Sequence, residues 1–324
     1  MNTAQFVLDN AELKPKAVKA MLVALHERGQ TVSDILEFVT ELEARKIKVP
    51  RVAKKAFDIC GTGGSGKARI NLSTALAIKL SKKYCIAKHG NKAASGRVGS
   101  FDVIESLKLP VGDTPEKVKQ QLTEQNLSFV FAPAFHPALK AMAPIRQSIP
   151  HPTIFNYLGP LLNPVNLTAQ MIGVPSLTVG EKLADVCAHL GKNAVIVHDT
   201  AFGLDDVSIG GVTKFWMSRK GDKNVHTGAF FPEDYGFKSV KNFKDLAGGD
   251  VAQNQLILKQ LIEGKAPKAQ QDFLAINEHI ASDFFARFWD RSVIARLKEF
   301  SAYHVAISLR GDPSQALDKP EIKT

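Results

Sequence analysis

At 324 residues, 44% of them hydrophobic and 23% charged, the chain has the composition of a globular protein with one large domain or two of average size. No apolar run approaches the roughly 18 residues that span a bilayer. Cys60, Cys85 and Cys187 form no CxxC pair, which excludes a cysteine zinc site and a disulfide framework and predicts a cytoplasmic protein. The formal net charge of +10 suits anionic partners, and these include phosphorylated small molecules as well as nucleic acid.

Helical signals open the chain. Apolar residues recur at helical spacing over residues 13–25, and Gly29 follows as a stop signal. Residues 31–34 read as a capping box ahead of a second apolar stripe over residues 35–42. We therefore predict two helices joined by a short turn, which form a small helical domain over residues 1–50.

From residue 56 onward, short apolar runs alternate with helical segments. Helices are predicted over residues 73–83, after Pro115 and around residues 284–297, and strands over residues 56–60, 84–87, 129–132, 170–174 and 194–198. This alternation indicates an α/β domain around a mainly parallel sheet. The proline-containing segment 137–163 interrupts it. We predict that this segment completes the small helical domain and that residues 56–136 and 164–324 form the larger one.

A glycine-rich loop follows the first predicted strand. Residues 61–66 read Gly-Thr-Gly-Gly-Ser-Gly, and a helix is predicted shortly after them. Backbone N–H groups in such a turn, together with a helix N-terminus, suit a phosphate or a diphosphate. The loop matches GxGxxG, but no acidic residue follows about twenty residues later to hold a ribose, which disfavours a dinucleotide. Taken alone, the loop could equally be a flexible turn.

Two neighbouring segments strengthen the prediction of a phosphate site. Asn71, Ser73 and Thr74 open the next helix with hydrogen-bonding side chains, which serve either as caps or as phosphate ligands. Residues 88–92, Lys-His-Gly-Asn-Lys, follow the second predicted strand. Because α/β proteins bind ligands at the carboxyl ends of their strands, these side chains are expected to line one site.

In this order, the segments resemble the anthranilate phosphoribosyltransferase family. The shared motifs are GTGG at 61–64, NxST at 71–74, KHGN at 88–91, GS at 99–100, His-Pro at 136–137, FNxLGP at 155–160 and GLD at 203–205. The resemblance runs from about residue 21 to residue 208 and fades in the last third of the chain.

The resemblance implies a fold and a reaction. The fold is similar to that of nucleoside phosphorylases and such phosphoribosyltransferases, with a small helical domain beside a larger α/β domain. The reaction moves phosphoribosyl from phosphoribosyl diphosphate to the amine of anthranilate or a similar aryl amine acid and releases diphosphate. The resemblance also implies magnesium as cofactor and a homodimer.

The resemblance further implies roles for individual residues. Ser65 and Arg69 are included among them, although both differ from the residues that the family has at these positions. Phosphoribosyl diphosphate would contact Gly61, Thr62, Gly63, Gly64, Ser65, Arg69, Asn71, Ser73, Thr74, Lys88 and Ser100. The acceptor pocket would comprise His89, Asn91, His136, Arg146, Gly159 and Pro160, with the guanidinium of Arg146 pairing with the carboxylate of the acceptor. Magnesium would be held by Ser73, Asp205 and Asp206. No residue is assigned as a catalytic base, because an aryl amine already has its lone pair free at neutral pH.

Departures from the family pattern cluster where the diphosphate would lie. Ser65 replaces the aspartate after GTGG, Arg69 replaces a threonine, and Lys67 lies between them. Asp206 stands where the family has glutamate, and Lys92 stands where it usually has arginine. We predict that cationic side chains here take over part of the charge neutralisation that relatives leave to metal. The alternatives are that Lys67 and Arg69 point to solvent, or that catalysis is lost or changed.

Two other functions stay open. A diverged non-catalytic relative that binds nucleic acid fits the net charge of +10, although aromatic residues are only 8% of the chain and do not interleave with basic ones for base stacking. A nucleoside phosphorylase fits the two-domain layout but not the residues at 88–91. The transferase is favoured because Asn91, His136 and Arg146 of the acceptor pocket are all present.

Overall fold

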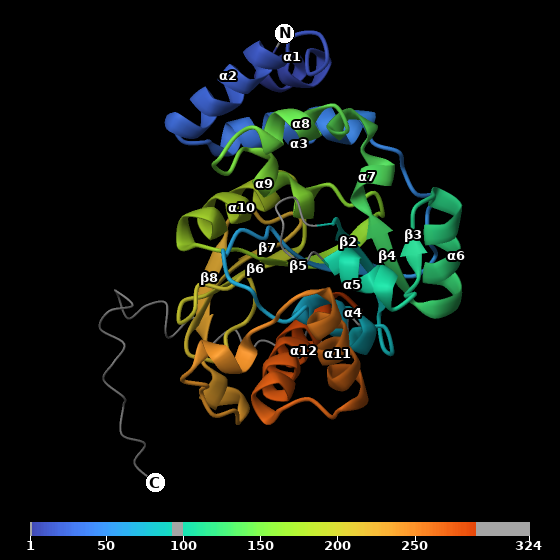
Figure 1. Ribbon diagram of the computed structural model, residues 1–324, viewed down its shortest axis with the longest axis vertical. Coiled ribbons are helices and arrows are strands. Elements are labelled where there is room, and N and C mark those ends of the chain that lie inside the picture. Colours follow the sequence, from blue (N-terminus) through green and yellow to red (C-terminus); the bar gives the residue numbers. More distant parts are fainter. Residues whose placement is uncertain (1, 93–99, 290–324) are drawn as a thin grey trace.

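The computed structural model describes residues 2–92 and 100–289, and one eight-stranded sheet forms its centre (Figure 1). The order of the strands across the sheet is β3-β4-β2-β1-β5-β6-β7-β8. Neighbours from β3 to β6 pair in parallel, whereas β7 pairs antiparallel with β6 and with β8. The strands are β1 (Ala56–Gly61), β2 (Cys85–Gly90), β3 (Val111–Gly112), β4 (Leu127–Phe131), β5 (Leu167–Gly173), β6 (Ala194–Asp199), β7 (Thr213–Ser218) and β8 (His226–Phe230).

Helices from two distant parts of the chain pack together above the sheet (Figure 1). The first group comprises α1 (Thr3–Asp9), α2 (Pro15–Glu27) and α3 (Val32–Arg45). The second comprises α8 (Met142–Gln147) and α9 (Phe155–Leu158), which contact α2 and α3. A single apolar cluster includes side chains of both groups, among them Leu22, Phe38, Met142 and Phe155. The division of the chain into two domains stays a prediction.

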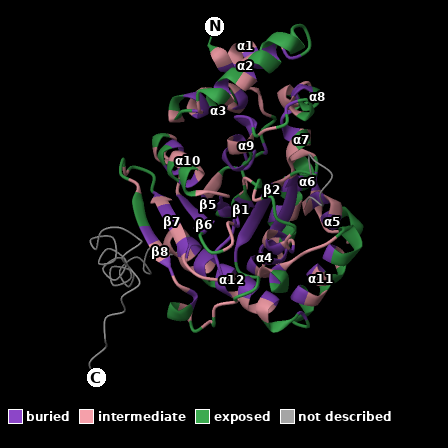
Figure 2. Cartoon of the chain, turned by 60° about the vertical axis from the view of Figure 1, so that its left-hand side comes forward, coloured by how far each residue is buried: buried purple, intermediate pink, exposed green. Residues whose placement is uncertain are grey.

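The two faces of the sheet bury alternate residues, as the pleat of a strand requires. Met171 and Val195 belong to the apolar cluster that includes α4 (Leu72–Leu80), α5 (Ser100–Ser106), α11 (Val251–Glu263) and α12 (Lys268–Trp289). Ile172 and Ile196 belong to the cluster of α10 (Leu177–His189) and the N-terminal helices. Figure 2 shows the strands buried between these layers. Within the described ranges, no helix is both long and apolar enough to cross a membrane.

The mainly parallel sheet and the five predicted strands are confirmed, with ends displaced by a few residues. The capping box is also confirmed, because the Asp34 N–H donates to the Thr31 hydroxyl at 3.2 Å and the Thr31 N–H donates to Asp34 at 2.8 Å. The elements β3, β7, β8, α1, α5, α10 and α11 lie outside the sequence-based prediction. Of the predicted helix at 284–297, residues 290–297 lie outside the described part. The remaining elements are α6 (Pro115–Gln125), α7 (Ala132–Phe135), η1 (Pro137–Leu139), η2 (Gly159–Leu161), η3 (Pro232–Tyr235) and η4 (Phe243–Leu246).

Candidate active site

The glycine loop leaves β1 at the carboxyl edge of the sheet and packs directly on the acidic loop that follows β6. The N–H of Gly63 donates to Oδ2 of Asp205 at 3.2 Å. A Cβ on Gly61 would lie 2.2 Å from the same oxygen, so this approach requires glycine. Gly63 and Gly64 have φ angles of 69° and 86°, a region that disfavours side chains. The loop therefore needs its glycines for geometry as well as for access to its backbone.

Arg69 lies between the two aspartates that the resemblance assigns to magnesium. Its guanidinium contacts Asp205 Oδ1 at 2.7 Å and Asp206 Oδ2 at 3.0 Å. The three side chains are 17%, 3% and 7% exposed. The second contact lacks hydrogen-bond geometry and is an ion pair only. The solvent-facing alternative is therefore wrong for Arg69.

Burial and charge act in opposite directions within this trio. Burial disfavours the charged form of Arg69, but the two carboxylates outweigh it and raise the pKa of the guanidinium. Burial likewise disfavours ionised Asp205, and Arg69 outweighs it and lowers the pKa of that carboxyl. For Asp206 burial dominates and raises the pKa to about 7 despite Arg69. Near neutral pH the cluster therefore holds a charged Arg69–Asp205 pair beside a half-protonated Asp206.

The C-terminal third of the chain positions Arg69. Arg69 bridges to Ala247, while the N–H of Gly248 donates to Ala68 O at 3.2 Å. The neighbouring Lys67 donates to the carbonyl of Phe202, and its ammonium lies 5.1 Å from the centre of the Phe243 ring. Residues beyond the range of the motif resemblance thus fix the altered part of the loop.

The start of α4 presents unpaired polar atoms. Asn71 makes no side-chain capping bond, and its Nδ2 is buried without a partner in the described structure. The hydroxyl of Thr74 is also buried without a described partner, and Ser73 between them is partly exposed. Because buried polar groups normally have a partner, these atoms are suited to bind a ligand rather than to cap the helix.

Lys88 and Ser100 lie at the neighbouring end of β2. Lys88 is only 4% exposed; burial lowers its pKa, while Asp58 and Asp206 oppose that effect. The Ser100 hydroxyl lies 3.2 Å from the Cβ position of Gly90. Thr62 and Ser65 are partly exposed in the loop itself. The fold thus gathers the residues predicted for phosphoribosyl diphosphate at one edge of the sheet. Gly99 of the predicted motif lies outside the described residues.

Two histidines of the predicted acceptor pocket face each other. The ring centroids of His89 and His136 are 5.5 Å apart. His89 Nδ1 bonds to the carbonyl of Gly159 at 3.0 Å, and His136 Nε2 bonds to the carbonyl of Leu162 at 2.9 Å. Burial lowers the pKa of His89 to about 3 and that of His136 to about 4. Both rings are therefore neutral at pH 7, and each has a buried second nitrogen with no partner among the described residues.

Arg146 lies on α8 with its guanidinium carbon 5.3 Å from the centre of the Phe155 ring. It is half-buried, burial lowers its pKa, and it makes no ion pair with any described residue. An unpaired cation at such a place is suited to bind a carboxylate. Pro160 is buried beside Gly159, whereas Asn91 is exposed and its side chain accepts from the N–H of Lys92 at 2.7 Å. Asn91 is thus the acceptor residue with the least structural support.

The sequence analysis missed two residues that hold the site together. Asn163 donates from Nδ2 to Asp58 Oδ2 at 2.9 Å and to the carbonyl of Ala87 at 2.8 Å. Asp58 in turn accepts from the N–H of His89 at 3.1 Å. An aspartate inside an otherwise apolar strand was a detectable signal, because a buried carboxylate needs partners. The sequence around Asn163 carries no comparable signal.

The arrangement does not fit magnesium at the acidic pair. Both carboxylates face a guanidinium, and no cluster of three or more histidines, cysteines, aspartates or glutamates among the described residues could hold a metal. Magnesium prefers oxygen ligands in octahedral geometry, so Arg69 would have to withdraw before the ion could bind. Ligation by Ser73, Asp205 and Asp206 stays a prediction.

Comparison with known proteins agrees with this architecture. Residues 53–284 match the model of a protein family described as "glycosyl transferase family, a/b domain". The fold and the loop at the carboxyl edge of the sheet therefore define a glycosyltransferase.

Individual relatives narrow the class. Anthranilate phosphoribosyltransferase of Dictyoglomus turgidum is 36% identical over 85% of this chain and 81% of its own. The crystal structure of the enzyme from Thermus thermophilus superposes with a TM-score of 0.75 at 32% identity, covering 85% of this chain and 82% of that one. The enzyme from Saccharomyces cerevisiae, solved in complex with PRPP and Mg, has a TM-score of 0.76 at 24% identity over 90% and 85% of the two chains, a likeness of fold. The chain belongs to the anthranilate phosphoribosyltransferase family.

Proposed function

We propose that this protein transfers phosphoribosyl from phosphoribosyl diphosphate to the amine of anthranilate or a closely similar aryl amine acid. The observation that carries the proposal is the set of unpaired polar groups at the carboxyl edge of the sheet. Asn71 Nδ2 and Thr74 Oγ1 are buried without described partners, and Lys88 on β2 is buried as well. A phosphorylated ligand would satisfy groups that are otherwise costly to bury.

The chemistry needs positioning and charge stabilisation rather than a strong base. The amine nitrogen forms a bond to C1 of the ribose, and the bond from C1 to the diphosphate oxygen breaks with its electron pair leaving on the diphosphate. The amine then releases a proton to solvent or to the departing group. Lys88 and Arg69 supply positive charge near the glycine loop, and the N-terminus of α4 adds partial positive charge.

The acceptor would lie by the helical unit, between the predicted domains 1–50 with 137–163 and 56–136 with 164–324. Arg146 would pair with its carboxylate, and the neutral rings of His89 and His136 would contact its aromatic ring and amine. Because both rings are neutral at pH 7, they act by shape and hydrogen bonding and not as imidazolium acids.

In this proposal the guanidinium of Arg69 replaces a cation at the acidic pair. Ser73, Asp205 and Asp206 would be the residues to hold magnesium, and Arg69 occupies the two carboxylates of that set. When bound, magnesium supplies charge neutralisation to the diphosphate. The family also favours a homodimer, which light scattering of the purified protein would test.

The test follows the loss of anthranilate fluorescence in the presence of phosphoribosyl diphosphate, with and without magnesium. We expect turnover by the natural protein and a KM for anthranilate at least about tenfold higher for Arg146→Ala, because a charge-assisted hydrogen bond contributes about 1.5–3 kcal/mol. Arg45→Ala, which alters a surface ion pair in the helical unit, is the matched control and should keep both constants. Absence of turnover in the natural protein under every condition would refute the proposal.

The ion pair of Arg69 with the acidic loop also favours a second candidate: a diverged relative without turnover that binds nucleic acid. The formal charge of +10 fits this function. A salt-dependent mobility shift of labelled single-stranded DNA, with no calorimetric binding of phosphoribosyl diphosphate, would establish it in place of the transferase.

A further inference from the structure

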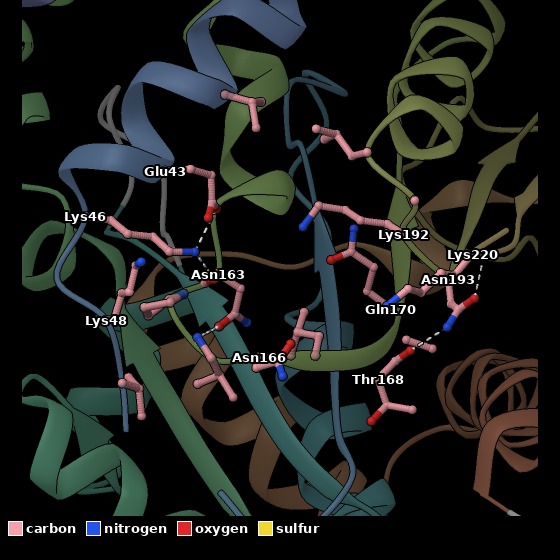
Figure 3. Close-up of a pocket in the computed structure, with 18 residues that line it drawn as sticks. Glu43, Lys46, Lys48, Asn163, Asn166, Thr168, Gln170, Lys192, Asn193 and Lys220 are labelled. Carbon is pink, nitrogen blue, oxygen red and sulfur yellow. Dashed lines mark hydrogen bonds and ion pairs between the residues drawn. The ribbon is translucent and has the colours of Figure 1, made fainter. Parts of the chain in front are cut away.

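A second polar cavity lies at the opposite edge of the sheet from the glycine loop (Figure 3). Its volume is about 490 Å³, which is within the usual range for small-ligand pockets. It lies where β5 begins and just ahead of β6, whereas the glycine loop follows the end of β1. The end of α3 and the segment after it form the other wall. None of the residues predicted for phosphoribosyl diphosphate or its acceptor lines this cavity.

Positive charge dominates the cavity. Four lysines line it: Lys46, Lys48, Lys192 and Lys220. Glu43 is the only acidic side chain among the lining residues that the structure describes. Figure 3 shows the ammonium groups of Lys46 and Lys192 extending into the space from opposite walls. The charges of Lys192 and Lys48 both lower the pKa of Lys46, so each of these two groups lies close enough to repel the ammonium of Lys46.

Only one of these lysines is neutralised. Lys46 donates to Glu43 at 2.7 Å and to the carbonyl of Asn163 at 3.0 Å. The ammonium groups of Lys48, Lys192 and Lys220 make no ion pair within the described part of the chain. Like charges held together in one concave site attract a counter-ion, because walls of low dielectric focus their field.

A buried carboxamide completes the cavity. Gln170 lines it and is 2% exposed, yet neither its nitrogen nor its oxygen makes a hydrogen bond within the described residues. The polar group that the amide approaches is the thiol of Cys187, a weak partner. In Figure 3 the amide lies on the same side as Lys192. A buried amide without a partner is costly unless a ligand satisfies it.

We infer that this cavity binds a small oxyanion carrying at least two negative charges, such as a phosphomonoester or a diphosphate. Lys48, Lys192 and Lys220 would neutralise it as point charges, and the Gln170 amide would donate to one of its oxygens. The bound anion would join the segment after α3 to the loop between α10 and β6. A nucleic acid is a poorer fit, because a polymer backbone could not bring its phosphate to an amide that is 2% exposed.

The experiment is calorimetric titration of the full-length protein with inorganic diphosphate, which probes both ends of the sheet. We expect two binding events in the natural protein. The double variant Lys48→Gln/Lys192→Gln should weaken binding at the second cavity about tenfold per lysine, since a hydrogen bond to a charged group contributes about 1.5–3 kcal/mol. Phosphoribosyl transfer should stay unchanged in this variant. Thr74→Ala should instead weaken binding at the glycine loop. Lys82→Gln/Lys119→Gln, two exposed lysines elsewhere, is the matched control for net charge and should change neither.

The Gln170→Met variant tests the amide separately. It keeps the volume and removes the unpaired polar atoms, so the free protein should be no less stable while diphosphate binds more weakly at this cavity. Three results would overturn the inference: a single event that Thr74→Ala removes, two events that survive Lys48→Gln/Lys192→Gln unchanged, or unaltered binding in Gln170→Met. Because binding is measured without turnover, the inference can fail or hold whatever becomes of the proposed reaction.

Discussion

Replacing Arg69 by alanine tests how the acidic pair is neutralised. In the structure the guanidinium contacts Asp205 at 2.7 Å and Asp206 at 3.0 Å, and none of the three side chains is more than 17% exposed. Removing one partner of a buried ion pair destabilises a protein by about 3–5 kcal/mol, because the remaining charge stays buried without compensation. We expect a loss of that size in the free energy of unfolding.

The loss should depend on pH in a defined direction. The pKa of Asp206 is already raised to about 7, and Arg69 is the first group that opposes this rise. Without Arg69 the pKa rises further. Asp206 is mostly protonated at pH 6 in both proteins, whereas at pH 8 it is ionised mainly in the natural one. The destabilisation should therefore be larger at pH 8 than at pH 6.

The assay is urea unfolding at both pH values, with and without magnesium. The freed carboxylates should bind the ion, so 10 mM magnesium should stabilise Arg69→Ala by about 1.4 kcal/mol for a dissociation constant near 1 mM and leave the natural protein unchanged. Arg45→Ala breaks ion pairs to Asp9 and Glu41 in which the arginine is 29% exposed, and should cost about 1 kcal/mol or less. If magnesium stabilises both proteins equally, or Arg69→Ala loses no more than the control, the reasoning is refuted.

Three further predictions concern packing and titration. Gly173→Ala would place a Cβ 1.8 Å from the carbonyl oxygen of Asp205 and should sharply lower the midpoint of urea unfolding. The control Gly159→Ala meets no atom within 4 Å and should keep the midpoint of the natural protein. Equal midpoints for the two variants would contradict the packing argument. Asn163→Leu should destabilise the protein by about 2–5 kcal/mol in urea, since two buried acceptors lose the amide as donor and the N–H of Val165 loses its acceptor. His136 has its pKa lowered to about 4, so the unfolded chain binds more protons below pH 6.5 and stability falls from there to pH 4. His136→Gln should reduce that fall by about 3 kcal/mol, and an unchanged pH profile would rule out the buried neutral ring.

Local patterns were sufficient to predict much of the architecture. The strands from β1 to β6, apart from the two-residue β3, are apolar runs bounded by turn residues, and Thr31 with Asp34 marks a helix start through neighbours in sequence. The glycine loop and Lys88 were identified because parallel strands end at one edge of the sheet. The antiparallel strands β7 and β8 were missed because their partially exposed residues carry no such continuous apolar run.

What the sequence by itself determined is the family, the parallel sheet and the set of residues at its carboxyl edge, because each depends on residue types at short spacing. Only the tertiary structure decided where the charges point. Arg69 and Asp205 are far apart in the chain, and their contact depends on the loop after β6 and on residues 246–248, which fix the backbone of Arg69. The lysines of the second cavity likewise come from the end of α3, the loop before β6 and the end of β7. Electrostatic interactions depend on distance and burial in space, and neither can be read from separation along the chain.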